Sequence, residues 1–276
     1  MLACSIATAA NAAIYTREDS IKVVTLLQQG AAQPKDCSLT SYYAKQFLGL
    51  PYVAHTLEGH TNEPLVVNLR QLDCTTLVDN CLALALTTQQ GSTSFADFCY
   101  WLERMRYRDG KRNGYPSRNH YWSQWVRSNT ALGLAEEVVS PQTHLQTQKL
   151  DLHYMSRHSA AYRMLKDAPQ AVKDLIQTYE QELSGQPVAY IPNEMLNKGR
   201  DVLTNVRDGD VLALVTSKDG LDVSHLGFAQ WGTDGKLHLL NASSIHHKVV
   251  LEPMTLYRYM KKHPTNLGIR VFRLKK

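Results

Sequence analysis

A cysteine at the start of an apolar helix is the residue of this sequence best suited to covalent chemistry. Cys74 lies in the segment LDCTTLVDN, directly after an extended stretch and after Asp73. The free N–H groups and partial positive charge of a helix N-terminus favour a thiolate over a thiol and can hold an oxyanion. Cys74 is therefore a candidate nucleophile, with the alternative that it is a small buried hydrophobe, as most free cysteines are.

A thiolate nucleophile needs a base, and His225 is the histidine with the most informative surroundings. It lies in DVSHLGFAQ at the start of an expected strand, whose alternation puts it on one face with Gly227. Asn241 ends the next expected strand, and a turn at 233–236 would pair the two strands antiparallel. An Asn carbonyl would fix the imidazole tautomer and aim the second ring nitrogen at the thiol. The predicted catalytic residues are Cys74, His225 and Asn241.

The other cysteines carry less information. The chain has five cysteines and no CxxC pair, so neither a zinc ribbon nor a disulfide scaffold is indicated. Cys81 and Cys99 fall on apolar helix faces and are expected in the core, while Cys37 has no partner that the sequence identifies. The motifs GxSxG, GxGxxG and HExxH and the P-loop are absent from the sequence. We therefore expect no metal and no cofactor.

The elements that must position these residues change in kind along the chain. Helical periodicity covers 38–50, 73–89, 95–107 and 160–183, and Ser94 is a suitable N-cap for the third of these. After Arg207 the pattern predicts strands at 211–216, 223–231, 237–240, 248–251 and 269–274. Helices early and strands late predict an α+β fold.

Composition describes a globular protein and excludes little else. The chain has 276 residues, of which 43% are hydrophobic, and a formal charge of +5 from scattered basic residues. This gives little support to a nucleic-acid partner, and no stretch reaches the roughly 18 apolar residues of a membrane span. The first residues, MLACSIATAANA, are typical of the end of a secretory signal peptide cleaved near residue 12, which would remove Cys4. A periplasmic or secreted location follows, unless the segment is an ordinary apolar arm.

Three blocks together resemble the NlpC-type branch of the papain-like cysteine peptidases, bacterial enzymes that act on cell-wall peptides. They are FLGLPYVAHTLE (47–58), LDCTTLVDN (72–80), and RDGDVLALV with VSHLGFA and LLNASS (207–244). The stretch GYPSRNHYWSQWVRSN (114–129) is similar to a narrower family described as N-acetylmuramoyl-L-alanine amidase-like. Relatives commonly have His where this chain has Asn241, and Asn can orient the base in the same way.

The resemblance implies a papain-like fold of the NlpC type, with a helical N-terminal half whose nucleophile helix packs on a C-terminal antiparallel sheet or half-barrel. It implies a thioester mechanism that cleaves the amide between N-acetylmuramic acid and L-alanine in muropeptides. Two alternatives stay open: a stem-peptide endopeptidase that cuts between D-Glu and the diamino acid, and a non-catalytic cell-wall-binding protein. Acyl transfer in place of hydrolysis would use the same residues.

The expected domain layout is a signal-peptide remnant at 1–12 and a single amidase domain at 13–276, with a helical and aromatic insertion around 108–200. We expect a monomer whose partners are peptidoglycan fragments. Arg118 suits a peptide carboxylate because its guanidinium has forked donors. An alternative for this region is a loop packed by its own aromatic side chains. The residues expected to bind substrate are Tyr52, Asp73, Arg118, His120, Tyr121 and Ser224.

Overall fold

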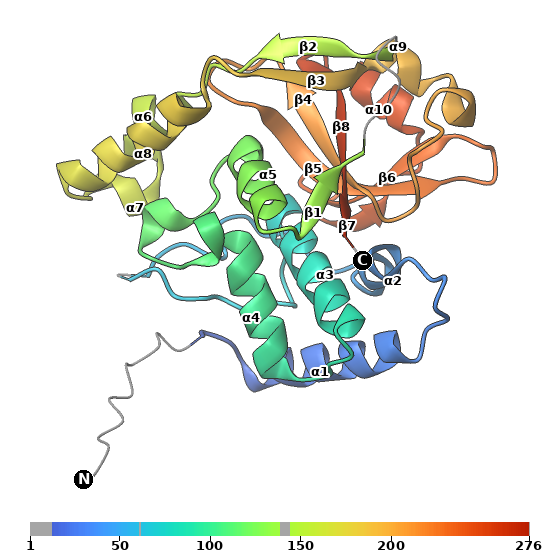
Figure 1. Ribbon diagram of the computed structural model, residues 1–276, viewed down its shortest axis with the longest axis horizontal. Coiled ribbons are helices and arrows are strands. Elements are labelled where there is room, and N and C mark those ends of the chain that lie inside the picture. Colours follow the sequence, from blue (N-terminus) through green and yellow to red (C-terminus); the bar gives the residue numbers. More distant parts are fainter. Residues whose placement is uncertain (1–12, 61, 139–143, 276) are drawn as a thin grey trace.

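Helices make up the first half of the chain, in a computed structural model that describes residues 13–60, 62–138 and 144–275. The first of them are α1 (Arg17–Ala31), α2 (Leu39–Gln46), α3 (Cys74–Gln89) and α4 (Phe95–Arg106) (Figure 1). α3 packs against the other three and against the sheet, and its sequence is apolar on nearly every side. The predicted signal-peptide remnant, with Cys4, lies outside the described residues.

The N-terminus of α3 is fixed by a reciprocal cap. Asp73 accepts a hydrogen bond from the Thr76 backbone N–H, and the Thr76 side chain accepts one from the Asp73 backbone N–H. Such caps satisfy donors that the helix itself cannot satisfy. The predicted helices at 73–89 and 95–107 are confirmed to within one residue at each end.

Two other helix predictions need correction. The helix expected at 38–50 ends at Gln46, and Gly49 then adopts a positive φ of 85° that turns the chain away. The single helix expected at 160–183 is wrong, because Pro169 interrupts it: the segment holds a 3₁₀ turn, the short α7 (Arg163–Lys166) and α8 (Gln170–Leu183).

An antiparallel sheet fills the other half, in the strand order β2-β3-β8-β4-β5-β6-β7, with β1 also paired to β8. The side chains of β4 alternate between two cores. Val211 and Ala213 join the core around α3, and Leu212 and Leu214 join a core under α9 (Asn193–Leu196) and α10 (Leu256–Lys261). The sheet is therefore the middle of three layers. The strands are β1 (Ala135–Glu137), β2 (Gln146–Lys149), β3 (Pro187–Pro192), β4 (Val211–Thr216), β5 (Val223–Trp231), β6 (Leu237–Ser243), β7 (Lys248–Leu251) and β8 (Asn266–Leu274).

The predicted packing of early helices on a late antiparallel sheet is confirmed in this coarse form. β4, β5 and β7 have the predicted bounds, β6 extends three residues further, to Ser243, and β8 begins earlier, at Asn266. The sheet is not purely C-terminal, however. β1, β2 and β3 come from the middle of the chain, so the region expected as an insertion completes the sheet.

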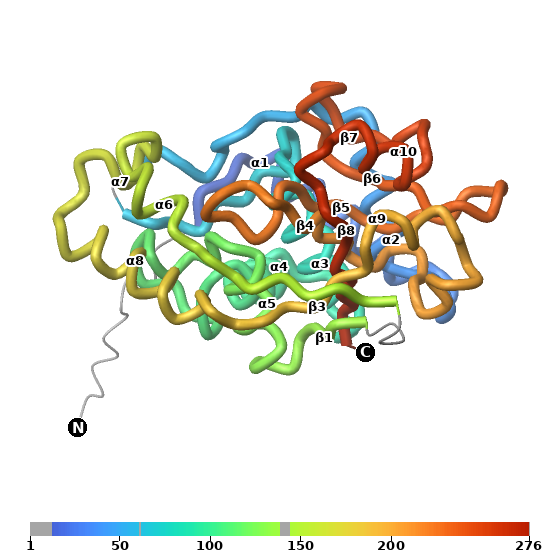
Figure 2. The backbone as a smooth tube through the Cα atoms, turned by 90° about the horizontal axis from the view of Figure 1, so that it is seen from above, coloured from blue at the N-terminus to red at the C-terminus, as the bar shows by residue number. Residues whose placement is uncertain are grey.

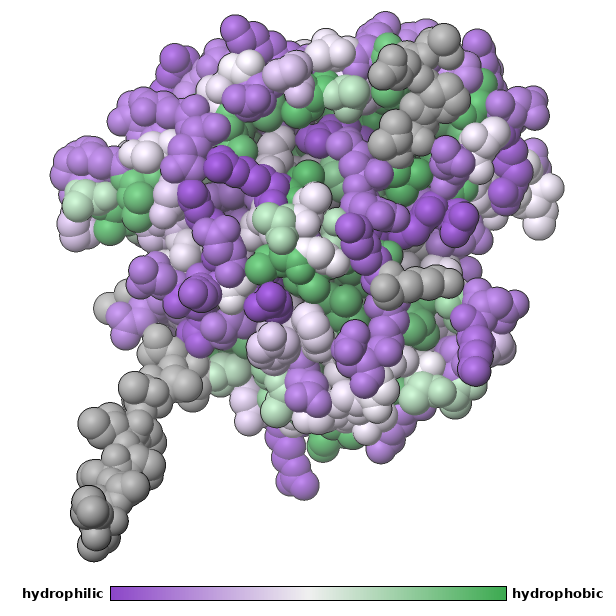
Figure 3. All heavy atoms as spheres, viewed as in Figure 1, coloured by the Kyte–Doolittle hydropathy of each residue, from purple (hydrophilic) through white to green (hydrophobic). Residues whose placement is uncertain are grey.

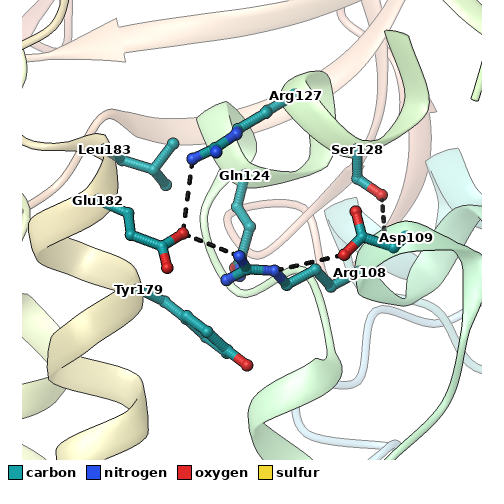
Figure 4. A pocket seen from close by; sticks show the side chains of 8 residues that line it. All are labelled: Arg108, Asp109, Gln124, Arg127, Ser128, Tyr179, Glu182 and Leu183. Atoms are coloured by element: carbon teal, nitrogen blue, oxygen red, sulfur yellow. Dashed lines mark hydrogen bonds and ion pairs between the residues drawn. The ribbon is translucent and has the colours of Figure 1, made fainter. Parts of the chain in front are cut away.

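The rest of the middle region forms an arm of helices at one end of the molecule (Figures 1 and 2). This helical arm comprises α6 (Tyr154–Arg157), α7 and α8 and has its own small core, which Tyr121 joins. Ion pairs attach it to the helical layer: Arg108 Nη2 lies 2.8 Å from Glu182 Oε2, and its guanidinium stacks on Tyr179. Figure 4 shows these groups facing one another across a small cavity between α8 and α5 (Trp122–Ala131).

Candidate active site

Cys74 is the first residue of α3 and its side chain is partly exposed. The preceding strand-like segment, which forms a bridge between Leu72 and Tyr52, delivers the chain to this position. The Asp73 cap takes the N–H of Thr76, which leaves the N–H groups of Cys74 and Thr75 at the open end of the helix. A thiol at this point lies beside donors that could hold an anion.

His225 and Asn241 lie on the paired strands β5 and β6. The His225 Nε2 atom is 2.9 Å from Asn241 Oδ1. Because an amide oxygen only accepts hydrogen bonds, Nε2 carries the proton, and Nδ1 is the nitrogen with a free lone pair. The Cys74 thiol is the other hydrogen-bonding partner of the ring. The order from thiol to imidazole to amide is the order that a Cys-His-Asn triad requires.

Gly227 leaves room for the imidazole of His225, on β5, to reach the side chain of Asn241, on β6. It lies one position beyond the Phe228–Leu240 pair of the ladder, between His225 and the facing Asn241. A Cβ atom there would lie 2.6 Å from the Leu240 carbonyl oxygen and 3.0 Å from Asn241 Cβ. The glycine therefore keeps open the space through which the imidazole and the amide meet.

The charge balance at His225 favours the imidazolium. Burial lowers the pKa of His225, but the charge and hydrogen bond of Cys74, the hydrogen bond of Asn241 and the charge of Glu252 outweigh it, so the pKa is raised. A proton held at this ring is available to a leaving group.

A cleft of about 150 Å³ opens beside these groups. Its walls are the N-terminus of α3, the start of β5 and the start of α5, where Trp122 and Trp125 stack with ring centroids 4.4 Å apart. The cleft contains Cys74 and His225, and Ser224 also lines it. The Ser224 hydroxyl lies 2.7 Å from Asn266 Oδ1, so its position is fixed by β8.

Two of the expected substrate-binding residues, His120 and Tyr121, line the cleft with their polar ends held by the protein. The His120 Nε2 donates to the Tyr115 carbonyl, 2.8 Å away. Burial and the positive charge of Arg118 lower the pKa of His120 to about 3, so this ring stays neutral. The Tyr121 hydroxyl donates to Glu180, 2.6 Å away, on the helical arm. Each of the two side chains therefore has a polar atom already engaged within the protein.

Arg118, expected to bind a substrate carboxylate, is engaged within the protein instead. Its buried guanidinium makes four hydrogen bonds, to both carboxylate oxygens of Glu63, to Glu58 and to the Leu57 carbonyl. The substrate role predicted for Arg118 stays a prediction, and Arg118 is not among the residues that line the cleft with Cys74. Arg118 anchors Leu57, Glu58 and Glu63, because its donors face these residues. No local sequence pattern pairs this arginine with the two carboxylates.

Tyr52 and Asp73, also expected to bind substrate, lie beside the nucleophile. Asp73 is occupied as the cap of α3. Burial and the charges of Cys74 and Asp73 raise the pKa of Tyr52, which keeps its hydroxyl protonated and able to donate. The Tyr52 hydroxyl is thus available to donate a hydrogen bond to a substrate, whereas Asp73 contributes by capping α3.

Sequence reasoning missed Glu252, which is only 1% exposed. Its Oε1 atom accepts from Asn241 Nδ2 at 3.2 Å, and its Oε2 atom lies 3.2 Å from His246 Nε2. The sequence feature that could have indicated Glu252 is its position one residue after the end of β7. The antiparallel register of β6 and β7 then puts it diagonally across from Asn241, but that register is not evident from the sequence.

Residues 13–60, 62–138 and 144–275 provide neither a metal-binding cluster nor a membrane-spanning helix. No group of three or more His, Cys, Asp or Glu side chains there could hold a metal ion. No helix among these residues is long and apolar enough to cross a bilayer. Hydrophilic residues cover most of the face shown in Figure 3, with smaller hydrophobic patches between them.

Comparison with known proteins gives a consistent family. The profile of the N-acetylmuramoyl-L-alanine amidase-like family matches residues 42–269. A crystal structure of an N-acetylmuramoyl-L-alanine amidase from Bacteroides uniformis ATCC 8492 is 38% identical, with a TM-score of 0.80, and the match covers 90% of this chain and 100% of that one. No curated protein sequence matches the chain significantly.

Two further structures are similar. A Bacteroides fragilis protein, provisionally described as a xylanase, is 42% identical, with a TM-score of 0.77 over 85% of this chain and 99% of its own. A Legionella pneumophila protein, at 22% identity, shares the fold with a TM-score of 0.69 over 94% of this chain and 95% of its own. Given the profile match over most of its length and relatives at 38% and 42% identity, the chain belongs to the N-acetylmuramoyl-L-alanine amidase-like family.

Proposed function

We propose that this protein is a cysteine-dependent hydrolase that cleaves the amide between N-acetylmuramic acid and L-alanine in muropeptides. The observation that carries the proposal is the hydrogen-bonded series of Cys74, His225 and Asn241 at the edge of a cleft. The name of the Bacteroides uniformis relative supports the choice of bond. No step of the reaction below calls for a metal or a cofactor.

The first half of the reaction forms a thioester. His225 Nδ1 takes the Cys74 proton, and the thiolate sulfur attacks the carbonyl carbon of the lactyl amide. The imidazolium keeps its Nε2–H bond to Asn241 and donates the Nδ1 proton to the nitrogen of L-alanine, which leaves as the amine. In the second half, His225 removes a proton from water, and the hydroxide releases the free lactyl carboxylate and the thiol.

The negative oxygen of each tetrahedral intermediate needs donors. The Cys74 backbone N–H at the open end of α3 is one, and the protonated hydroxyl of Tyr52 is the other. One oxyanion donor of this kind contributes about 3–4 kcal/mol to transition-state stabilisation in enzymes where it has been removed.

We further propose that the fold is papain-like and of the NlpC type. A nucleophile at the start of a buried helix, facing a His and an Asn on neighbouring antiparallel strands, supports this assignment, because papain-like enzymes use Cys, His and Asn in these roles. This assignment goes beyond family membership, and it rests on the placement of these three residues.

The xylanase description of the Bacteroides fragilis relative does not fit the cleft. A glycosidase needs two carboxyl groups that flank the scissile bond. The acidic residues lining the cleft are Asp79, which pairs with Arg106 at 2.9 Å, and Asp222, which accepts from the Ser123 and Val223 backbone N–H groups. Both are buried and engaged, so neither is available to a glycosidic oxygen.

The partners proposed with this activity are soluble peptidoglycan fragments, acted on by a monomer. The net charge of +5 suits stem peptides that carry several carboxylates. A periplasmic or secreted location also belongs to the proposal, because this is where cell-wall substrates are found. It rests on the pattern of residues 1–12 alone.

The test is product analysis by mass spectrometry on defined muropeptides, with the wild-type protein and the Cys74→Ala variant. We expect the wild type to release intact stem peptide and free muramic sugar, and the variant to be slower by about 10³-fold or more. Cys37→Ala is the matched control, since Cys37 is a second, partly buried free thiol that lies outside the cleft. It should react like the wild type.

Other products would decide between the alternatives. Truncated stems would indicate the endopeptidase, and a sugar conjugate in place of the free lactyl acid would indicate acyl transfer. Binding without any Cys74-dependent product would leave only a cell-wall-binding protein. Release of xylose oligomers from xylan would contradict the proposal outright.

A further inference from the structure

The side-chain amide of Asn241 can take two orientations, and the triad requires only one of them. Its amide has an oxygen and a nitrogen of nearly equal size, and a rotation of 180° exchanges them without changing the packing. The side chain is fully buried, so no solvent decides between the two orientations. A neighbouring group in the protein must therefore determine whether the amide oxygen or the amide nitrogen of Asn241 faces His225.

The choice matters because it sets the tautomer of the base. With the oxygen toward His225, Nε2 carries the proton and Nδ1 is free to take the proton of Cys74. With the amide nitrogen toward His225, Nε2 would have to accept, so the proton would sit on Nδ1. That ring could not act as a base toward the thiol.

Glu252 is the neighbour that favours one orientation of the Asn241 amide. Its Oε1 lies 3.2 Å from Asn241 Nδ2, and an ionised carboxylate only accepts hydrogen bonds. The opposite orientation would put the amide oxygen against a carboxylate oxygen in a buried setting, where such repulsion is strong. His246 holds the second carboxylate oxygen, with its Nε2 at 3.2 Å.

We propose that Glu252 is a positioning residue that fixes the amide orientation of Asn241 and thereby keeps His225 in the tautomer that accepts the thiol proton. The inference rests on the proposed function, because it gives Glu252 a role in the same triad. The charge of Glu252 also helps to raise the pKa of His225, which acts in the same direction.

Two substitutions separate this role from simple packing. Glu252→Asp is shorter but still only accepts, whereas Glu252→Gln keeps the size of the side chain but can present either a donor or an acceptor. If Glu252 sets the orientation, Asp preserves the Nε2–H tautomer better than Gln does. If Glu252 only fills space, Gln is the better replacement.

The readouts do not need a substrate. The ¹⁵N shifts of His225 in labelled protein report the tautomer, and the rate of Cys74 alkylation by iodoacetamide at neutral pH reports thiol activation. We expect the Gln variant to show a mixture of tautomers and an alkylation rate lower by roughly tenfold to a hundredfold, since one charge-assisted hydrogen bond is lost. Wild-type values for both readouts in the Gln variant would overturn the inference.

A double variant at positions 241 and 252 gives a second test, in which both side chains keep nearly their original size. Asn241→Asp alone should lose most of the alkylation rate, because two carboxylates would then face each other. Adding Glu252→Gln restores a donor behind the new carboxylate, and we expect the double variant to recover at least about tenfold over the single one. Failure to recover, with both proteins folded by circular dichroism, would contradict the proposed role.

Asp210→Asn is the matched control. Asp210 is a buried carboxylate that pairs with Arg273 at 2.7 Å, and it precedes β4 at the end of that strand remote from His225. Its loss should weaken the fold without changing the His225 tautomer. These readouts also stand apart from the proposed function: a wild type that cleaves no muropeptide but shows the predicted tautomer and Asp-over-Gln order would contradict only the proposed reaction.

Discussion

The charge on His225 depends on Cys74. Burial would lower the pKa of the imidazole, and the largest effect that opposes burial is the charge of Cys74. The hydrogen bond between the thiol and the ring acts on the pKa of His225 in the same direction. Such coupling is what a nucleophile and its base need in order to exchange a proton during a reaction.

The coupling gives a prediction with a definite sign. In Cys74→Ala the opposing charge and hydrogen bond are gone and burial remains, so the pKa of His225 should fall below its wild-type value. Titration of the His225 resonances by NMR measures both values. Cys81→Ala is the control, because Cys81 is the second thiol of α3 and is buried in the core. An unchanged or higher pKa in Cys74→Ala would show that the thiol does not face the ring.

The same shift has a consequence for stability. Because the pKa of His225 is raised above its ordinary value of 6.5, its contribution to the free energy of unfolding is complete below that value. The contribution is lost as the pH rises through the raised pKa. A wild-type stability that declines as the pH rises above 6.5, and a flatter profile in Cys74→Ala, would follow from this.

At the scale of elements, the β5–β6 ladder carries most of the site geometry. Gly227 is the point where the two strands leave room for the catalytic side chains, since an added Cβ would meet the Leu240 carbonyl and Asn241. No φ constraint demands glycine here, so the requirement is for space alone.

Gly227→Ala should therefore affect both stability and catalysis. Forcing a methyl group into this contact costs about 1–3 kcal/mol of unfolding free energy and moves Asn241 away from His225. Chemical denaturation and muropeptide turnover of the same preparation test the two effects. Gly235→Ala, in the turn of the same hairpin, should lose about 1 kcal/mol through its positive φ and keep its turnover. Full turnover in Gly227→Ala would mean that the site does not depend on this spacing.

How far the sequence predicts these elements depends on how local their signals are. The 73–89 helix and the β4, β5 and β7 strands come from periodicity within one segment, which the sequence shows directly. β3 begins and ends with proline, so its strand character is hidden. Glu252 was missed for a related reason, because its contact with Asn241 follows from the pairing of two strands.

At the scale of the whole molecule, Arg118 joins separate parts of the chain. It precedes α5, beside the cleft, and its guanidinium is held by Glu58 and Glu63 from a segment far earlier in the sequence. All three charges are largely withdrawn from water. The pairing is not a local signal, which is why the sequence favoured a substrate role for this arginine.

Arg118→Met should lower the free energy of unfolding by about 3–5 kcal/mol, because it leaves two carboxylates buried without their partner. Urea denaturation measures the loss. Arg127→Met is the control. The Arg127 side chain is 61% exposed and its Nη1 atom forms a surface pair with Glu182 Oε2 at 3.5 Å, so the loss should stay within about 0.5 kcal/mol. If Arg118→Met kept its stability but raised KM for muropeptides, the original assignment to a substrate carboxylate would be restored.

The position of β8 bears on when the candidate site is assembled. β8 is the last strand of the described chain, yet it lies between β3 and β4 in the interior of the sheet. A ribosome makes this strand after every other part of the site, and strands that pair across such a distance form late. A nascent chain thus carries Cys74, His225 and Asn241 without the sheet that aligns them. The alignment of these three side chains therefore depends on a strand that is made after all of them and that pairs with β4.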